Sequence, residues 1–386
     1  MKALVLDAGN TASYHVMRSL ATHGHTVHLA GGTDCAFFES RYCAGAHHAP
    51  SPHDGQSYLR FLLGVLGSHD FGVLFFCGGH HAQLVWQHRE QLQPVVECLI
   101  PTARHREVAF SKLAACAHVR QLGLPIPRTR RLDSLERLGA VIAGLRFPIV
   151  LRTEKGCAES EVRIAGSLPE AEACARRFSV PALEPRRPLC VQEYIPGQAY
   201  VVHVLMSFGQ PMALCVHRKD RELPSGGGVT SAGTTVRQPE LEEAALQILT
   251  SLDWHGLAKL DFRRDERDGA FTFIGLDVRV SPSIDITRAA GCDQIAMAGE
   301  LAAGRTPTPQ LHFQEGVRYR WLFPHDALAL LAKPWRAPSY AAEFLSPGVH
   351  WDLSPRDRRP FWRSVRGLAG HLKERLKSRA LARPGA

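Results

Sequence analysis

Short apolar runs alternate with amphipathic stretches over residues 1–103, and this alternation restricts the fold more than any other feature. Expected strands lie at 2–7, 26–30 and 73–76, and expected helices lie at 11–23, 55–67 and 80–92. In the stretch 11–23, Val16 and Leu20 share one helical face. Strands that alternate with helices form a parallel sheet covered by helices, so this region is predicted to be an α/β domain.

The pattern changes after residue 104. A helix is expected at 106–122, and Pro125 and Pro127 then require an extended chain. Later strands are expected at 148–152, 162–164, 189–194, 200–208, 211–218, 256–264 and 270–280, with helices at 169–178 and 239–252. The last two strands are joined by the charged turn 264–269, which makes them antiparallel neighbours. The second part is therefore predicted to contain mainly antiparallel sheet.

Several common nucleotide and metal motifs are missing. The turn after the first strand, Ala8-Gly9-Asn10-Thr11-Ala12, lacks G-x-G-x-x-G, which disfavours a NAD site. Gly-Lys does not occur, so a Walker A loop is excluded, and H-E-x-x-H is absent. The ten cysteines contain no C-x-x-C pair and are interpreted as small buried apolar residues.

Histidines occur as adjacent pairs at 47–48 and 80–81, and as His23, His25 and His28 across a helix-to-strand turn. Adjacent side chains point to opposite sides of a strand and diverge on a helix, so such a pair rarely chelates a metal. These histidines are predicted to be ordinary surface or core residues.

The positive charge is concentrated at the end of the chain. Of the net charge of +9, residues 356–386 contribute ten Lys/Arg and two acidic residues, so the rest is nearly neutral and nucleic-acid binding is not indicated. A basic amphipathic helix is expected from Pro360. Two interpretations remain open: a helix docked on its own domain, which is slightly favoured, or contact with an anionic membrane. No apolar run is long enough to span a membrane, so a cytoplasmic protein is expected.

The segments Lys259-Leu260-Asp261 and Gly275-Leu276-Asp277-Val278-Arg279 carry the clearest chemical signal. Alternate residues of a strand share a face, so Lys259 and Asp261 point one way, as do Asp277 and Arg279. Two carboxylates and two cations can then converge on one polar surface. Carboxylates of this kind bind Mg²⁺, which together with the cations neutralises phosphate oxygens. A solvated face with cross-strand ion pairs is an equally good interpretation of the hairpin alone.

The order of segments resembles the ATP-grasp superfamily. The matching segments are Phe110-Ser111-Lys112 with Gly123-Leu124-Pro125-Ile126-Pro127, Phe147-Pro148-Ile149-Val150-Leu151-Arg152, Val191-Gln192-Glu193-Tyr194-Ile195-Pro196-Gly197, and Asp261 with 275–279. The resemblance covers roughly residues 1–305. It implies an ATP-grasp fold preceded by a Rossmann-like parallel α/β domain.

The resemblance also implies roles for individual residues. Lys112 and Arg152 would hold phosphates of ATP, and Asp261 and Asp277 would bind Mg²⁺. The hinge residues that would receive adenine are Gln192, Glu193, Tyr194 and Ile195. Arg279 would face the transferred phosphoryl group and Lys259 the developing oxyanion. Arg218 and the loop 224–228 would lie near the acceptor substrate.

The implied domains are a Rossmann-like domain (1–103), two ATP-grasp lobes (104–185 and 186–310) and a C-terminal extension (311–386). The implied activity is an ATP-dependent ligase that joins a small-molecule carboxylate to an amine through an acyl phosphate. The oligomeric state stays open, with a homodimer among the options.

Three departures from the family pattern leave a second interpretation open. Gly275 replaces the metal-bridging glutamate, the phosphate loop 154–161 is acidic, and Ala199 falls near the expected ribose-binding acid. The alternative is a nucleotide-binding protein that has lost catalysis and acts by conformation.

Overall fold

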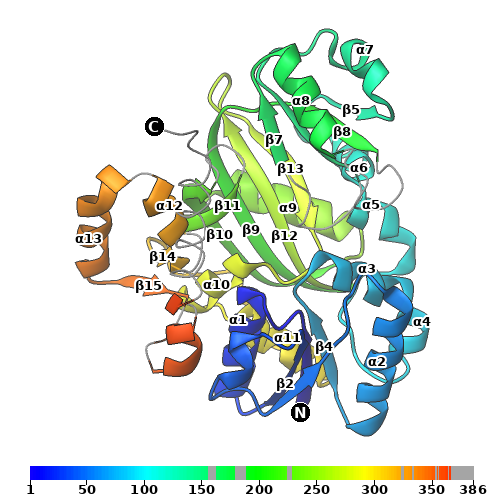
Figure 1. Ribbon diagram of the computed structural model, residues 1–386, viewed down its shortest axis with the longest axis vertical. Helices are drawn as coiled ribbons and strands as arrows, with labels where there is room; N and C mark the ends of the chain where they lie inside the picture. The colour runs from blue at the N-terminus through cyan, green and yellow to red at the C-terminus, as the bar shows by residue number, and fades with distance from the viewer. Residues whose placement is uncertain are drawn as a thin grey trace, which may run out of the picture.

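Three sheets organise the computed structural model of this chain. The structure describes residues 1–154, 162–178, 188–223, 228–322, 326–332, 334–352, 354, 356–363 and 365–366. The N-terminal domain, the large central sheet and the small-sheet lobe follow one another along the long axis, and the C-terminal extension lies beside the central sheet (Figure 1). The expected acidic loop beyond Glu154 and the glycine-rich loop at 224–227 lie outside the described residues.

The N-terminal domain is the expected parallel α/β unit. Its strands are β1 (Lys2–Leu6), β2 (Thr26–Gly31), β3 (Gly45–His48) and β4 (Val73–Phe76), and its helices are α1 (Thr11–Thr22), α2 (Gly55–Ser68), α3 (Gly79–Gln87) and α4 (Arg89–Leu92). All neighbouring strands pair in parallel, in the order β3-β2-β1-β4. Alternate residues of β1 face opposite sides: Leu4 and Leu6 share one core cluster with residues of α2 and α3, and Ala3 and Val5 share the other with residues of α1. Helices therefore cover both faces of the sheet.

The small-sheet lobe is antiparallel. Its strands are β5 (Thr129–Leu132), β6 (Ile149–Thr153), β7 (Val162–Ala165) and β8 (Leu189–Glu193), in the order β5-β8-β6-β7, and its helices are α7 (Leu138–Ile142) and α8 (Leu168–Phe178). Because β8 pairs with both β5 and β6, this lobe extends to Glu193, past the expected boundary at residue 185.

The prediction of a single helix over residues 106–122 is wrong. The structure has α5 (Arg106–Phe110) and α6 (Lys112–Gln121), separated by Ser111. Ser111 has an extended backbone, and its hydroxyl accepts a hydrogen bond from the Ala114 amide, so it caps α6. Lys112 is therefore the first residue of a helix instead of lying in the middle of one.

The central sheet has seven strands in the order β13-β12-β9-β10-β11-β14-β15. Their bounds are β9 (Gly197–Ser207), β10 (Gln210–Leu223), β11 (Val229–Thr235), β12 (Gly256–Asp265), β13 (Phe271–Asp277), β14 (Arg318–Arg320) and β15 (Val349–Trp351). The helices α9 (Pro239–Ser251), α10 (Asp285–Ala289) and α11 (Gln294–Ala302) accompany it. Leu260 and Phe262 pack with residues of α9 in the main core, which leaves Lys259 and Asp261 on the opposite face of the sheet.

A buried cluster around Asp285 joins the N-terminal domain to the central sheet. The Asp285 carboxylate accepts hydrogen bonds from Arg18 on α1 and from the Tyr319 hydroxyl on β14. Arg288 donates two more, each of 2.9 Å. Burial raises the pKa of Asp285, but these cations and His15 outweigh burial, so its pKa lies well below the usual range. The carboxylate is thus held ionised where α1, α10 and β14 meet.

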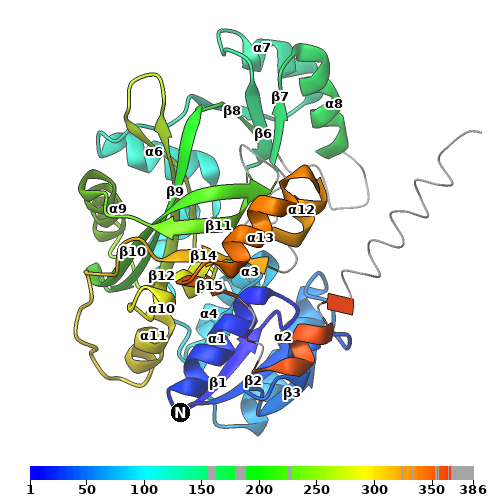
Figure 2. The ribbon, with the colours of Figure 1, turned by 90° about the vertical axis from the view of Figure 1, so that its left-hand side faces the viewer.

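The C-terminal extension packs on the rest of the chain. It contains β14, α12 (Ala327–Ala332), α13 (Ala337–Leu345) and β15, and Figure 2 shows α12 and α13 beside the edge of the central sheet. Residues 358–363 are helical, Phe361 packs against the N-terminal core, and the Arg363 guanidinium lies 3.0 Å from the Asp34 carboxylate. This start of the expected basic helix is docked on the protein, and the leucines at 368–376 lie outside the described residues.

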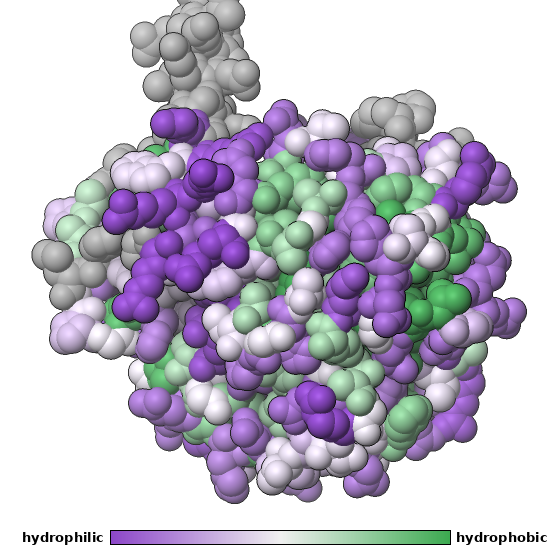
Figure 3. Space-filling model, turned by 90° about the horizontal axis from the view of Figure 1, so that it is seen from below, coloured by the Kyte–Doolittle hydropathy of each residue, from purple (hydrophilic) through white to green (hydrophobic). Residues whose placement is uncertain are grey.

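Among the residues that the structure describes, no helix is both long and apolar enough to cross a membrane. Figure 3 shows polar side chains spread over the face seen from below, with apolar areas between them.

Candidate functional site

The hairpin of β12 and β13 brings the predicted chemical residues together. In the strand register Lys259 lies opposite Asp277, and Asp261 lies opposite Gly275. The Lys259 ammonium is 2.9 Å from the Asp261 carboxylate and 4.0 Å from the Asp277 carboxylate. Arg279 Nε lies 3.3 Å from Asp277, and its terminal nitrogen donates a 2.7 Å hydrogen bond to the Cys77 carbonyl. The expected convergence of two carboxylates and two cations is therefore confirmed.

These residues belong to a longer chain of ion pairs across the polar face of the central sheet. Lys219 on β10 lies 3.4 Å from Asp261 and 3.4 Å from Glu222. Glu222 in turn lies 3.7 Å from Arg263, whose guanidinium stands 5.5 Å from the centre of the Tyr194 ring. We name the residues 194, 263, 222, 219, 261, 259, 277 and 279 the polar chain. It runs without interruption from the hinge after β8 to Cys77 in the N-terminal domain.

The Asp261 carboxylate is the most perturbed group in the polar chain. Burial raises its pKa, but Lys259, Lys219 and Arg152 more than compensate, and the pKa is held well below its usual range. Its Oδ1 is buried and accepts no hydrogen bond from the described residues, although Lys219 is close. A buried carboxylate oxygen without a donor is a suitable ligand for a cation.

Gly275 leaves open space beside Asp261. A Cβ atom built at Gly275 would meet no atom of the described residues within 4 Å. The carboxylate oxygens of Asp261 and Asp277, with this open space next to them, fit a hard divalent cation such as Mg²⁺. This ion prefers carboxylate ligands and retains water molecules in its coordination shell.

The small-sheet lobe supplies two further cations. Lys112 is buried at the start of α6, and its amide donates a 3.0 Å hydrogen bond to the carbonyl of Glu154 at the end of β6. Arg152 lies on β6, where burial lowers its pKa while Asp261 and Asp277 oppose that effect. Arg152 is therefore close enough to the polar chain to interact with both of its aspartates. The Glu154 carboxylate, which was expected to face the phosphates, accepts a hydrogen bond from the Ser111 hydroxyl.

The hinge residues connect the small sheet to the central sheet. Gln192 is buried and donates a 2.9 Å hydrogen bond to the Thr129 hydroxyl, while Ile195 is buried in the hinge. The Glu193 carboxylate lies 2.7 Å from Arg267 in the β12–β13 turn. Glu193 thus fixes the hinge to the hairpin that carries the two aspartates.

Arg218 is the one predicted site residue outside this arrangement. It lies on β10 next to Lys219, but alternate residues of a strand face opposite sides, and its guanidinium pairs with Asp220 at 2.8 Å. Sequence reasoning missed Lys219, Glu222 and Arg263. A register irregularity between Lys219 and Glu222 changes the alternation in β10, so the pattern of polar residues there did not reveal which ones share a face with Asp261.

Solved structures with the same architecture come from the ATP-grasp superfamily. N5-carboxyaminoimidazole synthetase from Staphylococcus aureus, solved with ADP, superposes with a TM-score of 0.68 at 11% identity, over 87% of this chain and 85% of that chain. An L-amino acid ligase from Bacillus licheniformis gives 0.63 at 13% identity, over 80% and 75%. Biotin carboxylase from Campylobacter jejuni gives 0.65 at 14% identity, over 82% and 74%. The chain therefore has the ATP-grasp fold.

A family model adds a narrower similarity. Residues 185–323 match the model described as "ATP-grasp in the biosynthetic pathway with Ter operon". This range contains the hinge, the central sheet through β14 and the whole polar chain. A search of the curated proteins found no match to this chain.

Proposed function

We propose that this protein is an ATP-dependent ligase that joins a small-molecule carboxylate to an amine. The observation that carries the proposal is the polar chain, which places Lys259, Asp261, Asp277 and Arg279 on one face between the small-sheet lobe and the N-terminal domain. The similarity of the protein's fold to the solved L-amino acid ligase and N5-carboxyaminoimidazole synthetase supports the proposed reaction class.

In the proposed reaction an oxygen of the substrate carboxylate attacks the γ-phosphorus of ATP, and the bond to the β-phosphate oxygen breaks. An acyl phosphate and ADP result. The amine then attacks the acyl carbon, phosphate leaves, and an amide remains after loss of a proton. Phosphoryl transfer of this kind depends on positioning and charge neutralisation, so no side-chain nucleophile is needed.

Each cation of the site has a distinct place in this proposal. Lys112 and Arg152 hold the phosphates from the small-sheet lobe, while residues 192–195 receive adenine. Arg279 orients the transferred group because Asp277 and the Cys77 carbonyl fix its guanidinium. Lys259 stabilises the negative charge that develops on the carbonyl oxygen when the amine attacks the acyl carbon. Mg²⁺ held by Asp261 and Asp277 would neutralise phosphate oxygens.

Thermal unfolding with ATP tests the nucleotide site. Ligand at 100 times its Kd should stabilise the protein by about 2.7 kcal/mol, and EDTA should remove most of this effect. The variant Asp261→Asn should lose the Mg²⁺ dependence. The matched control is Asp268→Asn, the same change in the exposed turn of the same hairpin. Equal Mg²⁺ dependence in both variants would contradict the assignment of Asp261.

Release of ADP tests the ligase reaction itself. Carboxylates and amines should be screened in combination, because the amine alone cannot accept the phosphoryl group in this mechanism. ADP formation that requires a carboxylate, together with an amide product detected by mass spectrometry, is the expected result.

The second candidate is a nucleotide-binding protein without catalysis, and Gly275 is the observation that favours it. Without the third carboxylate the site has two metal ligands from the hairpin. A Mg²⁺-dependent response to ATP with no ADP release from any acid and amine pair would support this candidate.

A further inference from the structure

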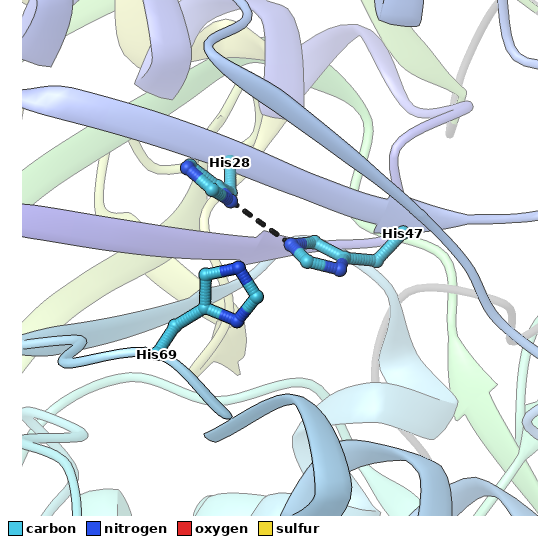
Figure 4. Close-up of side chains that lie close together, drawn as sticks. All are labelled: His28, His47 and His69. Carbon is cyan, nitrogen blue, oxygen red and sulfur yellow. Dashed lines mark hydrogen bonds between the residues drawn. The ribbon is translucent and has the colours of Figure 1, made fainter. Parts of the chain in front are cut away.

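Three histidines distant from the polar chain converge at the edge of the N-terminal sheet. His28 lies on β2, His47 on the edge strand β3, and His69 directly follows α2 (Figure 4). In the parallel register His28 lies opposite Gly45, two residues before His47, so His28 and His47 share one face of the sheet. His69 reaches the same place from the segment that leads into β4.

The imidazoles are close enough to share one ion. One ring nitrogen from each histidine can be chosen so that all three lie within 4.8 Å of one another. His28 Nδ1 and His47 Nε2 are 2.9 Å apart. Nitrogen ligands of a tetrahedral Zn²⁺ ion stand about 2.0–2.1 Å from the metal and hence about 3.4 Å from each other. Small side-chain rotations would therefore complete the triangle.

Surrounding residues hold the rings in this arrangement. The Ser68 hydroxyl lies 2.9 Å from His69 Nδ1, which leaves Nε2 of that ring for a ligand role. The Phe71 ring stacks on His69 at 5.5 Å and meets His28 edge-on at 5.2 Å. A Cβ atom at Gly45 would lie 2.5 Å from the His28 ring, so glycine at this position leaves the room that the imidazole occupies.

The protonation state also suits a metal. Burial lowers the pKa of His28 to about 4, assisted by His47, His69 and Lys2. Burial and the neighbouring histidines lower the pKa of His47 as well. The lowered pKa values favour the neutral forms of His28 and His47, which are the forms that bind metal. Lys2 is a nearby positive charge that would repel a bound cation.

We propose that His28, His47 and His69 form a binding site for a borderline divalent transition-metal ion such as Zn²⁺, with water as the fourth ligand. The ion would replace the hydrogen bond between His28 Nδ1 and His47 Nε2, and the proton of that bond would move through water to the other nitrogen of the same ring, so that both rings stay neutral. It would bind the edge strand β3 to β2 and to the start of β4. The site is separate from the polar chain, so it does not depend on the proposed ligase activity.

The test is a titration of the full-length protein, freed of any histidine tag, with Co²⁺ and Zn²⁺ in the absence of nucleotide. We expect one equivalent of Co²⁺ with the visible absorption bands of a four-coordinate site, and displacement by Zn²⁺. His47→Gln and His69→Gln should each weaken Zn²⁺ binding by more than about 10-fold, since even changes in residues behind metal ligands weaken binding 10- to 100-fold. Both side chains are partly exposed, so these variants should fold normally.

The matched control is His48→Gln on the same strand, because its ring contacts Phe38 on the other face. Binding should be unchanged in this control. Three outcomes would overturn the proposal: no binding at 1 mM metal, equal affinity in all three variants, or a sulfur-to-cobalt charge-transfer band. The last would assign the metal to cysteines, of which nine described ones are free.

Discussion

Replacing Gly275 by glutamate should destabilise the metal-free protein and create a new dependence on Mg²⁺. The new side chain enters open space directly opposite Asp261. Directly opposite residues of an antiparallel pair have Cβ atoms about 5 Å apart. At an effective dielectric constant of about 20, two negative charges at that distance repel by about 3 kcal/mol.

Two effects reduce this penalty. Lys259, 2.9 Å from Asp261, screens part of the repulsion. Replacing a glycine within a strand increases the free energy of unfolding by about 0.5–1 kcal/mol, because glycine loses more backbone freedom on folding than other residues do. The expected net loss is about 1–2 kcal/mol in the free energy of unfolding. Mg²⁺ with ATP should reverse it, since a third carboxylate increases the affinity of an oxygen site for a divalent cation.

The assay is urea unfolding in EDTA and in Mg²⁺ with ATP. Gly275→Gln is the matched control, because it has nearly the same volume and no charge. The glutamate variant should unfold at lower urea than the glutamine variant in EDTA and at higher urea with Mg²⁺ and ATP. Equal midpoints for the two variants in both conditions would show that position 275 does not face the carboxylates. A gain of ADP release in the glutamate variant would favour a metal site that has lost a ligand.

Three further predictions concern single groups. Asp285→Asn leaves Arg18 buried without its counter-charge and should cost about 3–5 kcal/mol in urea unfolding; a loss below about 1 kcal/mol would contradict this. Burial lowers the pKa of both His15 and His203 to about 3, against about 6.5 in the unfolded chain. Below pH 6.5 the unfolded state therefore binds more protons than the folded state. The free energy of unfolding should fall by up to about 1.4 kcal/mol per pH unit for each histidine as the pH drops to 4, and the slope should be smaller in the His15→Gln variant. Arg279→Lys should lower turnover by about 10²–10³-fold while the thermal shift with Mg²⁺ and ATP persists, and unchanged turnover would remove Arg279 from the mechanism.

The hairpin shows how far the sequence could lead. Alternation along a strand placed Lys259 and Asp261 on one face, and the short charged turn required an antiparallel partner. The observed register agrees with both inferences. The parallel N-terminal sheet could be predicted equally well, because its strands and helices alternate along the sequence.

Other parts of the site could not be read in this way. Lys219 reaches Asp261 from β10, which pairs with β9 and β11 but not with β12. An irregular register in β10 also hides which face of the strand Lys219 is on. The sequence also gave no reason to pair Arg263 with Glu222, because their contact depends on how the strands are ordered in the sheet. Ser111 interrupts the expected helix because its hydroxyl caps the helix that follows. Hydrophobic periodicity does not indicate such a capping hydrogen bond.

The histidines illustrate the same limit. The sequence predicted that an adjacent pair rarely chelates by itself, yet His28 and His47 meet across two parallel strands and His69 joins them from a third segment.

The sequence by itself determined the alternating strands and helices of the N-terminal domain and the shared face of Lys259 and Asp261, because these properties follow from periods of two and 3.6 residues. Only the tertiary structure decided the order of the strands, the position of Cys77 against Arg279, and the cations around Asp261 that hold its pKa below the usual range. Those features arise from contacts between segments far apart in the chain, and local pattern carries no information about such distances.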